Sequence, residues 1–215
     1  DAETVNAGDG LEALLLASDL QGRTKDDRLL GEWLPQRLIS ISQQGAIPSL
    51  DRIGVFLCGD LYAKPGGLKL GGSGDVRPVW RAFAKAFRWV VGVAGNHDQF
   101  GNESADFQQF LQDEGAGFVD GSLVERDGLA IAGISGVVGN PERPFSRTDD
   151  EFVAAVDRLL QRRPDVLIMH DGPDDPETGG YGIPAVRERL LRYPRSVLVV
   201  RGHSRWKRTL VQLSP

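Results

Sequence analysis

The 215-residue sequence has little cysteine, no excess of positive charge and no long apolar run. Its one cysteine, Cys58, cannot form an intrachain disulfide and is expected to be a small buried hydrophobic residue. No stretch approaches the roughly 18 apolar residues of a membrane helix, and no signal peptide is visible. These absences exclude a fold held by intrachain disulfides and argue against a membrane partner. A cytoplasmic location is the default expectation.

The balance of charge argues against a protein that holds nucleic acid through a global basic surface. The chain has 25 Lys and Arg against 30 Asp and Glu, a net charge of −5. A local basic patch would still suffice for a polynucleotide substrate. The contents of 40% hydrophobic and 26% charged residues are ordinary for a soluble globular protein. The length favours one α/β domain, residues 1–215, with a substantial core.

Histidine is scarce too, and all three histidines follow apolar runs. They are His97, His170 and His203. Two other apolar runs, 14–19 and 55–60, end in aspartate. In open α/β sheets, ligands bind outside the carboxyl ends of strands, so these five endings predict one shared site. One such histidine would most often be structural, but the combination favours a functional site.

Apolar periodicity predicts strands that alternate with helices. The expected strands are Glu12–Ser18, Ile53–Gly59, Phe87–Val91, Phe118–Val119, Ser122–Val124, Leu129–Ile134, Val166–Met169, Ser196–Val200 and Thr209–Leu213. The expected helices are Arg28–Gln43, Asp75–Phe87, Asn102–Asp113, Asp149–Gln161 and Pro184–Arg192.

Local signals refine these expectations. The continuous apolar run of the first strand predicts burial on both faces. Pro35 is expected to kink or divide the first helix, and Asn102 or Ser104 to cap the third. Asp-Gly pairs between the middle strands suit hairpin turns. The glycine-rich stretch 61–74 lacks the ending of a phosphate-binding P-loop and is expected to be a mobile loop beside the site.

The order of polar endings, Asp, Gly-Asp, Gly-Asn-His-Asp, His and Gly-His, resembles the calcineurin-like metallophosphoesterase superfamily from Asp19 to His203. The resemblance implies an α/β fold in which a two-sheet β-sandwich is flanked by helices, giving four layers. The family pattern is Asp-x-His, Gly-Asp, Gly-Asn-His, His and Gly-His-x-His. This sequence departs from it twice, because Gln21 and Arg205 stand where two histidines are expected.

The resemblance implies a divalent metal cofactor of one or two ions that share Asp60. The second ion would also be held by Asn96, His170 and His203, so its ligand set is complete. A carboxylate, an amide oxygen and two imidazoles suit Mn²⁺, the favoured cation, with Fe or Zn²⁺ as alternatives.

The first ion has lost both of its imidazole ligands. It would be held by Asp19 and Asp60, with Gln21 offering an amide oxygen as a weaker ligand. Arg205 is not expected to ligate, because a guanidinium stays protonated. The second ion should therefore bind more tightly than the first.

Three residues are candidates for catalysis. By resemblance, His97 would contact the phosphate and stabilise the transition state or protonate the leaving oxygen. Asp98 would orient His97, or would simply be a turn or cap residue. If residues 203–205 are extended, Arg205 would project into the site beside His203 and offer a bidentate fork to phosphate. The alternative is that Arg205 points to solvent.

The leading hypothesis is a metal-dependent phosphoric ester hydrolase that uses a metal-activated hydroxide. Its partner would be a phosphate-ester substrate, with diesters, nucleotides or nucleic acid favoured over proteins. The alternative is a catalytically weakened binding or scaffold protein, which the two lost histidines favour. The retained His97 argues against it, because a scaffold needs metal ligands at most. No partner protein can be named from the sequence.

Overall fold

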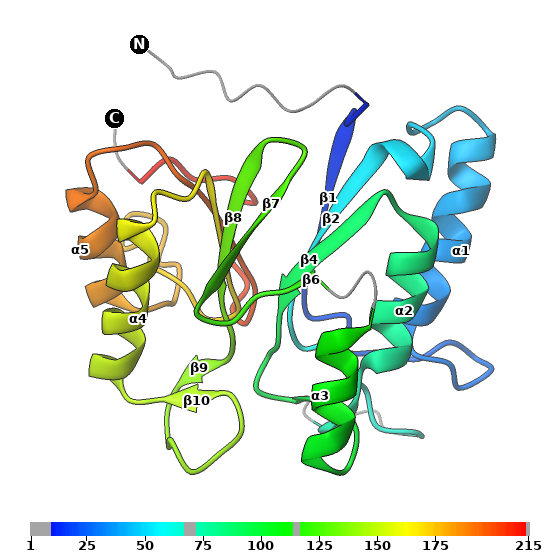
Figure 1. Cartoon of the computed structure of the whole chain (residues 1–215), viewed down its shortest axis with the longest axis horizontal. Helices are drawn as coiled ribbons and strands as arrows, with labels where there is room; N and C mark the ends of the chain where they lie inside the picture. Colours follow the sequence, from blue (N-terminus) through cyan, green and yellow to red (C-terminus); the bar gives the residue numbers. More distant parts are fainter. Residues whose placement is uncertain (1–9, 67–71, 114–116, 214–215) are drawn as a thin grey trace.

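The computed structural model describes residues 10–66, 72–113 and 117–213. Two four-stranded sheets lie face to face (Figure 1). The first is all parallel, in the order β1 (Ala13–Ala17), β2 (Ile53–Cys58), β4 (Trp89–Val93) and β6 (Gly117–Phe118). The second has the order β12 (Leu198–Arg201), β11 (Val166–Met169), β8 (Leu129–Ile134) and β7 (Ser122–Arg126), and only β7 is antiparallel to its neighbour.

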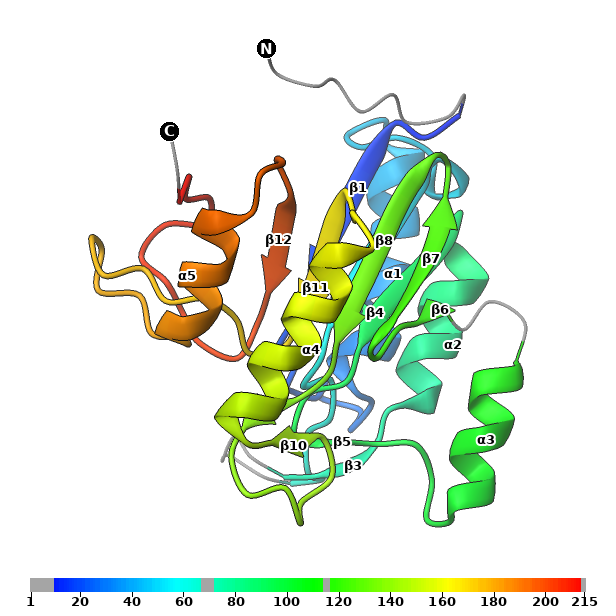
Figure 2. The ribbon, with the colours of Figure 1, turned by 60° about the vertical axis from the view of Figure 1, so that its left-hand side comes forward.

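Helices cover the outer faces of both sheets, as Figures 1 and 2 show from two directions. The first sheet is covered by α1 (Leu30–Gln43), α2 (Arg77–Ala86) and α3 (Ser104–Gln112). The second sheet is covered by α4 (Asp149–Gln161) and α5 (Pro184–Arg192). This arrangement confirms the predicted four-layer α/β sandwich.

Short elements complete the described chain. They are the 3-10 helix Leu50–Arg52 and the two-residue strands β3 (Gly74–Asp75), β5 (Asp98–Gln99), β9 (Val137–Val138) and β10 (Ser146–Arg147). The part of 61–74 that comprises residues 67–71 lies outside the described residues. No helix of the described residues is long and apolar enough to cross a membrane.

The core follows from side-chain alternation along the strands. In β2, Val55 and Leu57 join the cluster shared with α1 and α2, while Phe56 and Cys58 face the second sheet. Ile131 of the second sheet packs in this same inter-sheet cluster. Burying a large apolar side chain contributes about 1.5–3 kcal/mol, so the inter-sheet cluster alone is a major source of stability.

The first strand is not buried on both faces as predicted. Leu14 and Leu16 are 38% and 52% exposed, whereas Ala17 is buried. The reason is that β1 is an edge strand that pairs only with β2. An apolar run predicts that a segment forms a strand, but it does not indicate whether that strand lies at the centre or at the edge of its sheet.

Several local expectations also fail. Pro35 does not divide α1, which runs unbroken through it. Glu103 precedes α3 as its cap residue, in place of Asn102 or Ser104, and the Asp106 carboxylate accepts the backbone N–H groups of residues 102 and 103. The expected strand Thr209–Leu213 has no regular structure.

The two Asp-Gly pairs behave differently. Asp127 and Gly128 form the tight turn of the β7–β8 hairpin, as expected. The pair at 120–121 instead carries the chain from the first sheet to the second, because β6 pairs in parallel with β4. The Asp127 carboxylate accepts hydrogen bonds from the Arg88 guanidinium and the Trp89 indole, so this turn also ties the two sheets together.

Candidate metal centre

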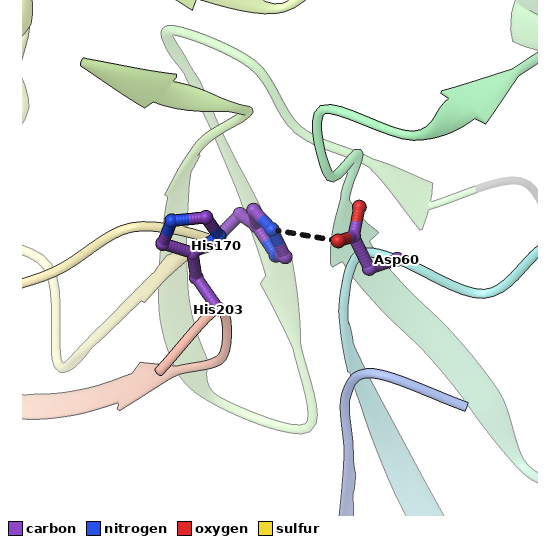
Figure 3. Close-up of side chains that lie close together, drawn as sticks. All are labelled: Asp60, His170 and His203. Carbon is purple, nitrogen blue, oxygen red and sulfur yellow. Dashed lines mark ion pairs between the residues drawn. The ribbon is translucent and has the colours of Figure 1, made fainter. Parts of the chain in front are cut away.

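The polar residues that follow four strands meet at one end of the sandwich. Asp60 follows β2, the triplet 96–98 follows β4, His170 follows β11, and His203 comes shortly after β12. Figure 3 shows the Asp60 carboxylate facing His170, with His203 beside it. One ligand atom from each of these three residues lies within 4.8 Å of the others. Both sheets therefore contribute to the cluster.

His170 is fully buried and its ring is oriented by a backbone group. Its Nδ1 lies 2.6 Å from the Cys58 carbonyl oxygen. A carbonyl only accepts, so Nδ1 carries the hydrogen and Nε2 is left to face Asp60, whose Oδ2 is 3.5 Å away. Burial lowers the pKa of His170, but the nearby Asp60 carboxylate outweighs it and raises the pKa above its usual value. A cation would thus compete with a proton for Nε2.

Asp60 is buried and its carboxylate is held on both oxygens. Oδ1 accepts the backbone N–H of His97 at 3.0 Å, and Oδ2 accepts the amide Nε2 of Gln21 at 2.9 Å. Burial raises the pKa of Asp60, yet the nearby His170 ring and the His97 contacts lower it below its ordinary value. The carboxylate is therefore ionised at neutral pH and fixed in place.

Three of the candidate ligands have left-handed backbone conformations. The φ angles are 53° at Asp19, 55° at Asp60 and 65° at His203. Such angles are uncommon outside glycine and cost of order 1–3 kcal/mol each, so they persist only where the surroundings impose them. The backbone at this end of the sandwich is strained at the residues that would bind a metal.

Two glycines of the motifs are required by close approach of the strand ends. A Cβ atom on Gly95 would collide with the carboxylate and backbone N of Asp60. A Cβ atom on Gly202 would collide with the Ser18 hydroxyl. Gly95 thus lets the ends of β4 and β2 approach each other within the first sheet, and Gly202 lets the end of β12 approach the end of β1 in the other sheet.

Asp98 makes no hydrogen bond to the His97 ring, and its contact with the Gly95 N–H supports the alternative role of a turn residue. Its Oδ2 accepts the backbone N–H groups of Asp60 and Gly95, both at 2.9 Å, and its Oδ1 accepts that of Leu61 at 2.8 Å. Burial raises the pKa of Asp98 to about 6, against the hydrogen bonds from Gly95 and Leu61, which lower it. Asp98 ties the end of β4 to the end of β2 and holds the strained backbone of Asp60.

The residues fit a bound cation. Asn96 Oδ1 and His170 Nε2 are buried and have no hydrogen-bond partner among the described residues. Buried polar atoms without partners are costly and need an explanation, which a metal ion would supply. Burial and the charge of His170 lower the pKa of His203, which favours its neutral, ligating form. With Asp60, these residues make a donor set that suits Mn²⁺, Fe or Zn²⁺.

The residues expected at the first ion are less well placed. Asp19 Oδ2 accepts the Ser18 hydroxyl at 2.5 Å and the His203 backbone N–H at 3.0 Å, and Asp19 lies outside the compact set of three. Gln21 reaches Asp60, but through its amide nitrogen rather than the oxygen expected to ligate.

Arg205 lacks the extended backbone that would carry it into the site. The chain is not extended over 203–205, because His203 has a positive φ angle and the Ser204 N–H donates to the Gly202 carbonyl oxygen at 2.7 Å. Arg205 is exposed and forms no hydrogen bond or ion pair with another described residue. Its position supports the solvent-facing alternative.

His97 is anchored through its backbone and keeps a partly exposed ring. Ring atom Nδ1 lies 3.4 Å from the Ser73 hydroxyl. Two supporting groups were missed by the sequence reasoning, namely the Cys58 carbonyl that orients His170 and the Ser18 hydroxyl on Asp19. Cys58 directly precedes the pair Gly59-Asp60, and Ser18 directly precedes Asp19. Every residue has a backbone carbonyl, so the sequence gives no sign that the one at Cys58 orients a histidine.

Comparisons with known proteins bear on the fold and the family of this chain. A solved crystal structure superposes with a TM-score of 0.55 over 88% of this chain and 83% of the other, at 12% sequence identity, which shows a shared fold alone. No curated protein matches the sequence. The sequence profile of the calcineurin-like phosphoesterases matches residues 14–205, which span the whole of the cluster. The chain belongs to the calcineurin-like phosphoesterase family.

Proposed function

We propose that the protein is a metal-dependent phosphoric ester hydrolase that acts on phosphodiester or nucleotide substrates. Family membership supports phosphoester hydrolysis. The observation that carries the proposal is the pair of buried, unpartnered atoms Asn96 Oδ1 and His170 Nε2 beside the ionised Asp60. These unpaired atoms favour a bound cation, and the retained His97 argues against a scaffold, which needs metal ligands at most.

Asp60, Asn96, His170 and His203 would hold the principal cation, and Mn²⁺ is the metal that we favour. When bound, such an ion polarises a phosphoryl oxygen and lowers the pKa of water toward neutrality. The hydrogen bond from His170 Nδ1 to the Cys58 carbonyl oxygen would fix the tautomer that leaves Nε2 free to bind the ion.

His97 is the proposed proton donor to the leaving oxygen. Its backbone N–H is fixed on Asp60 Oδ1, while its ring is partly exposed and open to a substrate. The Ser73 hydroxyl near Nδ1 would keep the ring oriented. An imidazole can donate a proton near neutral pH, which typically contributes about 10²–10⁴-fold to rate.

Hydrolysis of bis-p-nitrophenyl phosphate tests the proposal. Protein stripped with EDTA should be inactive and should regain activity with Mn²⁺. His97→Ala should keep the metal and lose about 10²–10⁴-fold in kcat on alkyl esters, and less on esters with good leaving groups such as bis-p-nitrophenyl phosphate. His97→Gln separates loss of the proton donor from loss of a polar side chain.

No hydrolysis of any diester, mononucleotide or cyclic nucleotide by metal-loaded protein would contradict the proposal. That result would favour the scaffold alternative. Equal loss on activated and unactivated esters in His97→Ala would show that His97 stabilises charge rather than donates a proton.

A further inference from the structure

A short basic segment follows the metal centre directly. Arg205, Lys207 and Arg208 are all exposed, and none forms an ion pair with another residue in the part of the chain that the structure describes. They lie two to five residues after His203. Because a chain advances at most about 3.6 Å per residue, the Cα atom of Arg205 is within about 7 Å of that of His203.

Three of the four acidic residues in the loop 171–182 are engaged elsewhere, and the fourth, Glu177, is exposed and sets one negative charge against the three positive ones. The Asp174 carboxylate pairs with Arg187 at 2.7 Å, and Asp171 lies 3.8 Å from the Arg201 guanidinium. Asp175 is buried and accepts hydrogen bonds within its own turn. A protein with a net charge of −5 therefore presents a segment with an excess of positive charge next to its candidate metal centre.

An exposed aromatic ring is held beside this segment. The Tyr181 residue is 81% exposed, yet its backbone carbonyl accepts hydrogen bonds from Arg201 Nη1 at 2.6 Å and from Trp206 Nε1 at 2.9 Å. The Trp206 ring in turn lies under the Arg201 guanidinium, 5.1 Å away. The backbone of Tyr181 is thus fixed by Arg201 and by Trp206 of the basic segment, while its ring is left exposed.

We propose that Tyr181 and residues 205–208 form a binding strip for single-stranded nucleic acid, which would deliver a phosphodiester to the metal centre. Cations that track the backbone and aromatic rings that stack on unpaired bases are the two elements of such surfaces. Paired bases are not free to stack in this way, so the strip favours single strands over duplexes. The inference rests on the proposed function, because it names the substrate class of that site.

Fluorescence anisotropy with a labelled 15-nucleotide oligothymidylate tests the strip. The titration is done in EDTA, so that binding is measured without hydrolysis. The wild-type protein should bind, and affinity should fall as salt is raised. Lys207→Ala/Arg208→Ala should weaken binding and reduce the slope of log K against log salt by about 1.4, or about 0.7 for each lost phosphate contact.

The matched control is Arg158→Ala/Arg162→Ala, which removes the same charge from exposed positions at the end of α4. It should leave the affinity unchanged. Tyr181→Ala should weaken oligothymidylate binding roughly tenfold and leave binding of base-free polyphosphate unchanged.

Three results would overturn the strip: no binding by the wild-type protein, equal weakening by both double variants, or tighter binding of duplex than of single strands. Hydrolysis of bis-p-nitrophenyl phosphate keeps the two proposals separate. The Lys207/Arg208 variant should hydrolyse this small ester at the wild-type rate. A protein that cleaves the ester but does not bind the oligonucleotide would refute the strip alone.

Discussion

Replacing Asp98 with asparagine tests whether this buried carboxylate positions Asp60. Both oxygens of Asp98 accept backbone N–H groups, those of Asp60 and Gly95 on Oδ2 and that of Leu61 on Oδ1. An asparagine has one acceptor oxygen. If that oxygen takes the Oδ2 position, the amide NH₂ faces the Leu61 N–H and neither donor has a partner.

The structure sets the size of the effect. An unsatisfied buried donor costs about 1–3 kcal/mol, partly offset here because a neutral amide is less costly to bury than a carboxylate. We expect a loss of about 1–2 kcal/mol in the free energy of unfolding at pH 7. The left-handed backbone of Asp60 stores about 1–3 kcal/mol, and metal binding must restore that geometry once its support weakens. Mn²⁺ affinity should fall about tenfold, equivalent to 1.4 kcal/mol.

Isothermal titration with Mn²⁺ measures the affinity, and urea unfolding measures the stability. Asp165→Ala is the control, because it removes the carboxylate that accepts the Ala130 N–H at 2.8 Å at the other end of β11. It should cost stability without changing Mn²⁺ affinity. If Asp98→Asn is destabilised but binds Mn²⁺ as tightly as the wild type, Asp98 has no positioning role and the reasoning is refuted.

Other substitutions test separate parts of the account. Asp60→Asn removes the charge that a cation needs, so elemental analysis should find the metal lost while circular dichroism remains unchanged; retained metal would contradict the assignment. Gln21→His should raise the affinity of a second Mn²⁺ ion by adding an imidazole beside Asp60, and an unchanged second binding step in calorimetry would argue against it. The hydrogen bonds from Arg88 hold the pKa of Asp127 below its ordinary 3.8. The stability that Asp127 contributes is thus present above that value and lost as pH falls through its folded pKa. Asp127→Asn should therefore cost about 1 kcal/mol at pH 7, and the difference from wild type should shrink below about pH 4 in urea titrations; a difference independent of pH would exclude the charge as its cause.

Much of the fold could be predicted from sequence where local signals coincide with packing. The bounds of α4, β11 and α5 match the predicted ranges, since Thr148 caps α4 and Pro184 begins α5. The predictions failed where the conformation or exposure of a segment depends on residues that are distant in sequence but close in space. A run of leucines cannot report that β1 lies at an edge, and a pattern of alternation cannot report the turn at His203 that redirects Arg205.

The candidate site likewise has features that the sequence predicts and features that depend on the assembled fold. The strand-end positions of Asp60, Asn96, His170 and His203 could be predicted from apolar runs and glycines. The partner of Asp98 could not, because a buried aspartate can accept any nearby N–H group and sequence order favoured its neighbour His97. The N–H groups that reach the Asp98 carboxylate are set by how closely the ends of β2 and β4 lie. That distance is known only once the two strands have paired in the sheet.

A titration of Mn²⁺ into metal-stripped protein, with calorimetry and bis-p-nitrophenyl phosphate hydrolysis recorded on the same samples, tests the central claim most directly. One tight ion should bind, and hydrolysis should rise with its occupancy; His203→Ala should weaken both together. Full occupancy without hydrolysis, or hydrolysis that is unaffected by EDTA and by His203→Ala, would contradict a metal-dependent phosphoesterase built on this cluster.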